Sequence, residues 1–349
     1  MWLSSSSVGR KAIMAFSGAA LLLFVTFHCL LNAIAICWPT TYNSVCMFLG
    51  ANWYALIASV ALAALIVIHI IYASVLTVKN RKARGEQRYA ISKRPATVEW
   101  SSKNMMVLGI VILAFLVIHL IQFWAKMQLQ EIRGAEEVIP PSAGTLFIQE
   151  AFSLVYTPIV YIIGFVALWF HLTHGFWSMF QSVGWDSTVW IPRLKKIGCW
   201  WVTLVCLCFT AQAIVFTVKA NEGFYKTNPE LRAQYKDMLV PMYERDFGPG
   251  AAQAGLQIQM TPYDQLASQF RQIVAQVGPQ YDNDDLFEMQ IASLPVDRQA
   301  EAREQRDSEK RMLHAYRNMV ALFDYLEGKG SEPEQPAIQV LPATAVQPQ

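Results

Sequence analysis

Residues 104–126 read NMMVLGIVILAFLVIHLIQFWAK, an apolar run that contains one histidine, His119. About 20 apolar residues in an α-helix cross roughly 30 Å of hydrocarbon, so this run predicts a transmembrane helix. An imidazole inside hydrocarbon is costly unless something binds it. His119 is therefore a candidate functional residue, and the same combination recurs along the chain.

Four further stretches have this length and apolar character, in a chain that is 54% hydrophobic and only 15% charged. The five predicted spans are residues 11–36, 52–78, 104–126, 151–180 and 197–218. Each of the first four spans contains at least one histidine in its interior, and the fifth contains none. These histidines are His28, His69, His119 and His171, with His174 as a second histidine in the fourth span.

The composition changes near residue 220. From Asn221 onward the chain has 12 Lys and Arg against 19 Asp and Glu, and long apolar runs cease. We therefore expect an all-α integral membrane protein with a five-span domain over residues 1–220 and a mostly helical soluble extension over 221–330. Residues 262–277 and 298–326 have amphipathic helical patterns. Residues 331–349 are rich in Pro, Gln and Ala and are predicted to be disordered. Nothing in the charge pattern indicates nucleic-acid binding.

Basic residues gather in alternate loops, which predicts the orientation in the membrane. The N-terminus and the second and fourth loops are basic, whereas the first and third loops have few basic residues. By the positive-inside rule, the N-terminus is cytoplasmic and the C-terminal extension is periplasmic in a bacterial inner membrane. The basic residues of the second loop are Lys79, Arg81, Lys82, Arg84, Arg88, Lys93, Arg94 and Lys103, and the acidic residues of the third are Glu131, Glu136, Glu137 and Glu150.

The four histidines fall at two depths when measured along their helices. At 1.5 Å per residue, His28 and His119 lie about 25 Å and about 24 Å from the cytoplasmic charges. His69 and His171 lie about 15 Å from them. Two imidazoles at one depth on neighbouring helices are what the iron of a haem with two axial histidines requires. The sequence therefore predicts a four-helix bundle that holds two b haems, with a fifth helix beside it.

The four histidines also have explanations other than haem. The histidines could be core residues satisfied by the backbone or by each other. A zinc site is disfavoured because each layer offers only two imidazoles, and a tetrahedral site needs more ligands.

Ser17 and Gly18 fall close to the helical stripe of His28, where small residues leave room for a flat ligand. The six cysteines have no metal-binding spacing; buried thiols are expected, with a Cys37–Cys46 disulfide as the alternative.

The fourth span continues as His171-Leu-Thr-His-Gly175-Phe-Trp-Ser-Met-Phe-Gln-Ser-Val-Gly184-Trp185. This run resembles the di-haem cytochrome b (b558-type) subunits that anchor succinate dehydrogenase and fumarate reductase, the succinate:quinone oxidoreductases. Those subunits share five spans, one ligand histidine on each of the first four, and an HxxxG motif followed by Gly-Trp. The third span, from Ser101 to His119, is also similar, and the resemblance covers about residues 8–220.

The resemblance implies that His171, rather than His174, is the fourth ligand. It also implies that His69 and His171 hold the inner haem b, and His28 and His119 the outer one. The expected partners are a flavoprotein with FAD and an iron–sulfur subunit on the cytoplasmic face, and the resemblance leaves open a dimer of such heterotrimers. Quinone, often menaquinone in this branch, would react near the outer haem.

One acidic position departs from the family pattern. Some members carry a glutamate two residues before the fourth ligand, where this chain has Trp169. Glu150, at the outer end of the fourth span, is the candidate catalytic residue for the quinol proton, and a plain interfacial carboxylate is the alternative.

The predicted function is therefore electron transfer between iron–sulfur clusters and quinone, with the dicarboxylate chemistry left to the flavoprotein. Two alternatives stay open. One is a cytochrome b anchor for another quinone-linked dehydrogenase, such as hydrogenase or formate dehydrogenase. The other is a non-haem transporter or scaffold that uses the histidines for protons or packing.

Overall fold

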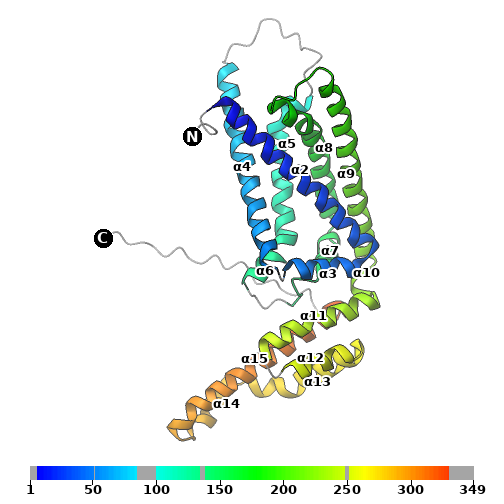
Figure 1. Ribbon diagram of the computed structural model, residues 1–349. Coiled ribbons are helices and arrows are strands. Elements are labelled where there is room, and N and C mark those ends of the chain that lie inside the picture. The colour runs from blue at the N-terminus through cyan, green and yellow to red at the C-terminus, as the bar shows by residue number, and fades with distance from the viewer. Residues whose placement is uncertain (1–5, 51, 85–99, 134–137, 248–250, 330–349) are drawn as a thin grey trace, which may run out of the picture. The chain divides into compact units, whose positions relative to one another are not determined.

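The computed structural model describes residues 6–50, 52–84, 100–133, 138–247 and 251–329, and the regular elements in these ranges are helices (Figure 1). The expected all-α class is confirmed for them. Five helices are long and apolar enough to cross a membrane, as expected of a multi-pass membrane protein. Some predicted features lie outside the described residues: Arg88, Lys93 and Arg94 of the basic loop, Glu136 and Glu137, and the tail 331–349.

The chain divides into two compact units. The first contains the described residues up to Arg133 and then Pro141–Leu231, and the second contains those from Arg232 onward together with residues 138–140.

The five long helices form the body of the first unit and run side by side in alternating directions (Figure 1). They begin and end close to the predicted spans. They are α2 (Ser7–Cys37), α4 (Trp53–Arg84), α5 (Trp100–His119) continued by the π-helix η1 (Leu120–Trp124), α8 (Tyr156–Ser182) and α9 (Trp190–Asn221).

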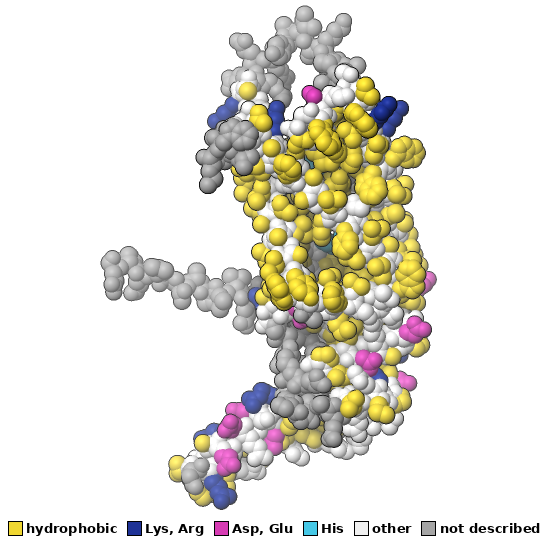
Figure 2. Space-filling view, in the orientation of Figure 1, with side chains coloured by type: hydrophobic (Ala, Val, Ile, Leu, Met, Phe, Trp, Pro, Cys, Tyr) yellow, Lys and Arg dark blue, Asp and Glu magenta, His cyan; other side chains and the backbone are white. Residues whose placement is uncertain are grey.

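The surface of these helices is apolar along most of its length (Figure 2). Large side chains such as Val60, Ile110 and Leu207 are more than half exposed, which suits a helix that faces lipid rather than water. Tryptophans mark the helix ends, and amphipathic indoles are enriched where a membrane meets water. Exposed tryptophans near the helix ends are Trp38, Trp53, Trp100, Trp124, Trp185 and Trp190.

The fourth spanning helix begins later than predicted. Residues 153–155 separate α7 (Gly144–Phe152) from α8, so the helix starts at Tyr156 rather than near residue 151. Pro158 accounts for this difference because it lies in the first turn of α8. A proline there loses no helical hydrogen bond, since the first N–H groups of a helix have no partner inside it.

Two connections between the spans are themselves helical. The uncharged first loop forms α3 (Pro39–Gly50), and the third contains α6 (Gln128–Arg133) and the almost wholly buried α7. Asn43 of α3 is fully buried, and its Oδ1 accepts hydrogen bonds from the backbone N and the Oγ1 of Thr145, each at 2.9 Å. This amide therefore binds an N–H in the first turn of α7 that has no helical partner. Both α3 and α7 lie at the same end of the bundle (Figure 1).

Glycines allow two of the helix contacts in the bundle. A Cβ at Gly164 of α8 would lie 2.6 Å from the ring of Phe115 in α5, and one at Gly198 of α9 would lie 2.4 Å from the ring of Phe176 in α8. Such close approach through small residues is typical of membrane helices. All six cysteines are free thiols, so the alternative Cys37–Cys46 disulfide is not formed.

The second unit is built around two long helices, α13 (Tyr263–Tyr281) and α15 (Val296–Glu327), which cover the two predicted amphipathic segments. Phe270 of α13 packs against Tyr316 and Phe323 of α15, and Arg271 bonds Asp324 and Glu327. The remaining helices of this part are α11 (Pro229–Phe247), which begins in the first unit, α12 (Ala251–Met260) and α14 (Asp284–Ala292).

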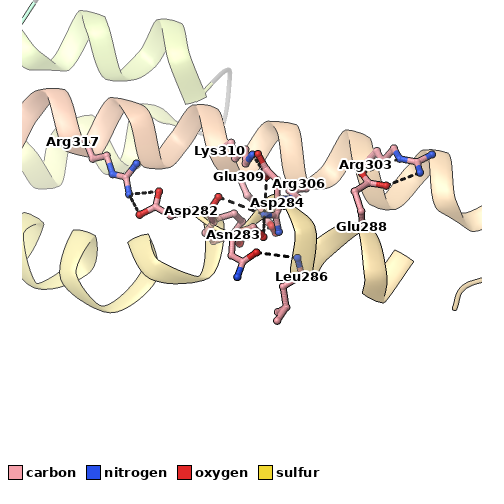
Figure 3. A network of polar contacts seen from close by, with 11 residues as sticks. Asp282, Asn283, Asp284, Leu286, Glu288, Arg303, Arg306, Glu309, Lys310 and Arg317 are labelled. Carbon is pink, nitrogen blue, oxygen red and sulfur yellow. Dashed lines mark hydrogen bonds and ion pairs between the residues drawn. The ribbon is translucent and has the colours of Figure 1, made fainter. Parts of the chain in front are cut away.

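A polar network fastens α14 to α15 (Figure 3). Asn283 caps α14 by accepting a hydrogen bond from the backbone N of Leu286 at 3.0 Å. The buried guanidinium of Arg306 donates to the carbonyl of Asn283 and to Asp284 Oδ1, both at 3.1 Å, and lies over the ring of Phe287. Lys310 also bonds Asp284, and Arg303 bonds Glu288 at 3.0 Å.

This network should loosen in acid. The hydrogen bond from Lys310, and then that from Arg306, hold the pKa of Asp284 below its usual 3.8, and Arg303 holds the pKa of Glu288 below its usual 4.5. A depressed pKa contributes stability that is present above the unfolded value and is lost as pH falls through the folded one. We expect the protection factors of the α14 amides against hydrogen exchange to be constant above pH 4.5, the unfolded pKa of Glu288, and to fall as the pH drops below it. Unchanged protection across this range, with exchange of the spanning helices as the control, would contradict the prediction.

Candidate functional site: two histidine pairs in the helical bundle

The histidines from α2 and α5 meet inside the bundle. The ring centroids of His28 and His119 are 5.8 Å apart, with the rings at 80° to each other. His28 stacks on Phe24 of its own helix and lies 6.2 Å from the ring of Phe209 in α9. His119 is the last residue of α5. We call these two residues the outer pair, after the expected topology.

A chain of polar side chains starts at His119. Its Nδ1 lies 3.1 Å from the hydroxyl of Tyr161, which donates to Gln122 Oε1 at 2.9 Å. The Nε2 of Gln122 donates to Thr157 Oγ1 at 3.0 Å. Tyr161, Gln122 and Thr157 are buried.

The π-helix η1 begins directly after His119 and contains Gln122. The wider turn of a π-helix adds a residue locally, and such segments are frequent at functional sites. It rotates the residues after His119 relative to a continuous α-helix. Gln122 is buried on η1 and meets two side chains of α8, Thr157 and Tyr161.

The histidines from α4 and α8 form a second pair. The ring centroids of His69 and His171 are 6.3 Å apart, with the rings at 59°. The Nδ1 of His69 lies 3.1 Å from Oγ of Ser17 in α2, and that oxygen donates to the carbonyl of Met14 at 3.2 Å. The Nδ1 of His171 is buried and has no hydrogen-bond partner. We call His69 and His171 the inner pair.

Three helices give the same separation between the two pairs. On α2, Ser17 contacts the inner pair, and His28 of the outer pair follows 11 residues later. On α8, Tyr161 contacts the outer pair and lies 10 residues before His171. On α5, Gly109 faces His171, with 4.0 Å from its ideal Cβ position to Cε1, and lies 10 residues before His119. At 1.5 Å per residue, the pairs are about 15 Å apart along the bundle.

Ser17 and Gly18 lie beside His69 of the inner pair, although the helical pattern of the sequence associates them with His28. A Cβ at Gly18 would lie 3.6 Å from Cε1 of His69. Sharing a helical stripe with His28 does not place them at its depth, because a separation of 10 or 11 residues along a helix spans about 15 Å. The room that a small residue leaves at this point is therefore beside His69.

The two remaining candidates from the sequence are His174 and Glu150. The ring of His174 packs edge-on against Trp177, 4.9 Å away on the same helix. The carboxylate of Glu150, in α7, forms an ion pair with Lys126 Nζ at 2.6 Å. Both side chains of this ion pair are mostly buried, with 17% and 23% exposure. The Trp169 indole donates to Thr203 Oγ1 at 2.8 Å.

A cavity of about 270 Å³ opens between α5, α8 and α9. It is lined by Trp100, Phe170, Thr173, Trp177 and Lys195 among others, and by none of the four paired histidines. On a helical wheel at 100° per residue, Phe170, Thr173 and Trp177 share a face of α8 that His171 does not. The cavity is therefore distinct from the inner pair.

The sequence reasoning missed the hydrogen-bond partners of the histidines. Gln122 and Tyr161 carried a usable signal, because a polar side chain inside an apolar span is costly unless it is bonded. Ser17 carried a weaker one, since serine can bond its own helix. Their pairing with particular histidines depends on how the helices are rotated, which a linear pattern does not give.

The structure thus brings two imidazole pairs together at two levels. Among the residues that it describes, no group of three or more His, Cys, Asp or Glu side chains converges. Comparison with protein-family models, curated proteins and solved structures finds no match for this chain.

Proposed function

We propose that the first unit is a cytochrome b that holds two haems, each between two histidines. The observation that carries this proposal is the spacing of the rings. Two imidazoles that held one iron between them, each with a metal–nitrogen bond of about 2 Å, would have their ring centroids about 6 Å apart. The observed separations are 5.8 Å and 6.3 Å.

The donor set supports haem over a metal held by the protein alone. Each pair offers two imidazoles and no third ligand among the described residues. Four-coordinate metal sites take their ligands from more side chains than this. Haem brings four ring nitrogens of its own and needs only the two axial positions.

When bound, haem supplies one-electron redox chemistry, and its axial ligands set the potential. The chain contributes the rest of the site. The four histidines would hold the iron, and Ser17 and Tyr161 orient two of the rings. Aromatic side chains such as Phe24, Phe209 and Phe115 pack around the histidines and exclude water.

We further propose that this cytochrome is the membrane anchor of a succinate:quinone oxidoreductase. The support is the His171–Trp185 run, the five spans and one paired histidine on each of the first four spans. The resemblance implies that the flavoprotein and iron–sulfur subunits bind at the cytoplasmic face, where the positive-inside pattern predicts the N-terminus to lie. Quinone, with menaquinone as the expected type, would then react near the outer pair. Glu150, which forms an ion pair with Lys126, is the candidate acid–base group there.

Purification from native membranes tests both parts of the proposal. We expect a reduced-minus-oxidised spectrum with a b-type α-band, two haems per chain, and co-purifying flavoprotein and iron–sulfur subunits. A protein without a b-type spectrum would refute the haem proposal and favour a transporter or scaffold. A haem protein that co-purifies with hydrogenase or formate dehydrogenase subunits would keep the cytochrome and replace the succinate assignment.

A further inference from the structure

The direction of the hydrogen bonds around His119 determines which ring nitrogen carries the proton. Gln122 Oε1 is a carbonyl oxygen and can only accept, so the hydroxyl of Tyr161 gives it its one proton. Toward His119 the Tyr161 oxygen therefore presents a lone pair. The Nδ1 of His119, 3.1 Å away, must donate to it. In a neutral imidazole the proton on Nδ1 leaves the lone pair on Nε2.

The same arrangement recurs at the inner pair with different residues. The hydroxyl of Ser17 donates to the backbone carbonyl of Met14, which can only accept. With its proton on the Met14 carbonyl, the Ser17 oxygen can accept a hydrogen bond from the Nδ1 of His69, 3.1 Å away. The tautomer of His69 that makes this bond carries its proton on Nδ1 and its lone pair on Nε2.

Each pair combines one anchored histidine with one in apolar surroundings. His119 and His69 have oxygen acceptors for Nδ1–H. In contrast, the Nδ1 of His171 has no partner, and the ring of His28 stacks on Phe24 and lies beside Phe209. A histidine that ligates a metal commonly donates its other ring N–H to an oxygen, which fixes the ring and strengthens it as a ligand.

We propose that Tyr161, backed by Gln122, and Ser17 are positioning residues that tune the two haems separately. This inference rests on the proposed function. Tyr161 and Gln122 set the donor strength of His119, and Ser17 sets that of His69. Neighbouring hydrogen bonds polarise one another, so the strength with which Tyr161 accepts from His119 depends on its own donation to Gln122. Gln122 therefore affects His119 without contacting the ring.

The test is a spectroelectrochemical redox titration of the purified protein. Tyr161→Phe removes the acceptor for His119, so His119 becomes a weaker donor to the oxidised iron. We expect both haems to remain bound and the outer component alone to shift to a more positive midpoint potential. Gln122→Leu should shift the same component in the same direction, and Ser17→Ala should shift only the inner one. The two components are assigned from the haem that His119→Ala retains.

Matched controls separate this effect from general damage to the bundle. Tyr156→Phe removes the hydroxyl of an exposed tyrosine on α8, and Ser178→Ala removes a hydroxyl that bonds its own helix. Neither should move either potential. Unchanged potentials, equal shifts of both components, or loss of either haem from Tyr161→Phe would overturn it. A wild-type protein without a b-type spectrum would instead refute the proposed function.

Discussion

His119→Ala is expected to lower the haem content from two to one per chain. The substitution removes the imidazole that faces His28 at 5.8 Å, so the outer iron would keep only one axial ligand. The ring of His28 keeps its contacts with Phe24 of its own helix and with Phe209 of α9. These two contacts do not involve His119. The inner pair lies about 15 Å away along the helices and has its own anchor, Ser17.

The measurement is the ratio of extracted haem to protein, together with the amplitude of the b-type α-band. His314→Ala is the matched control, because His314 is an exposed histidine of α15 in the second unit. It should leave both haems bound. Two results would contradict the assignment of His119 to the outer pair. One is that His119→Ala retains two haems, and the other is that His119→Ala and His69→Ala lose the same haem.

His171→Ala and His174→Ala should differ sharply, although the two histidines lie one turn apart on α8. His171 faces His69 with 6.3 Å between the ring centroids, whereas His174 packs on Trp177 of its own helix. Alanine at position 171 should therefore abolish binding of the inner haem. Alanine at position 174 should leave both haems bound, with small changes in band shape at most.

Haem content and electron paramagnetic resonance of the two variants provide the comparison. Because both are His→Ala changes on one helix, a general effect on α8 would appear in both. A loss of haem from His174→Ala with both haems kept in His171→Ala would reverse the choice that the HxxxG motif suggests. The inner ligand would then be His174.

The spanning helices could be predicted from sequence because length and hydropathy suffice for them. The predicted span 104–126 corresponds to Trp100–Trp124. What hydropathy did not give was the structure between the spans. α3 contains no charge but folds around the buried Asn43, which caps α7. The start of α8 at Tyr156 was not predicted either. Proline is tolerated in the first turn of a helix and disrupts its interior, so the effect of Pro158 depends on where the helix begins.

The candidate site was predictable in its histidines and not in their partners. Depth along a helix follows from residue counts, so two layers could be expected from the sequence. Rotation about the helix axis does not follow from counts, and it decides that Ser17 bonds His69 and that Tyr161 bonds His119. The π-helix after His119 adds a local rotation that no periodic pattern shows. That these rings bind haem stays a prediction.

The 10- or 11-residue offset between the pairs has an electrical consequence. About 15 Å is half of a hydrocarbon core of roughly 30 Å. An elementary charge that crosses the whole core at 100 mV changes its energy by about 2.3 kcal/mol, so a charge moved between the two layers would change by roughly half of that. If the two pairs hold haems as proposed, the membrane voltage would favour electron flow between them in one direction and oppose it in the other, with no change in any side chain.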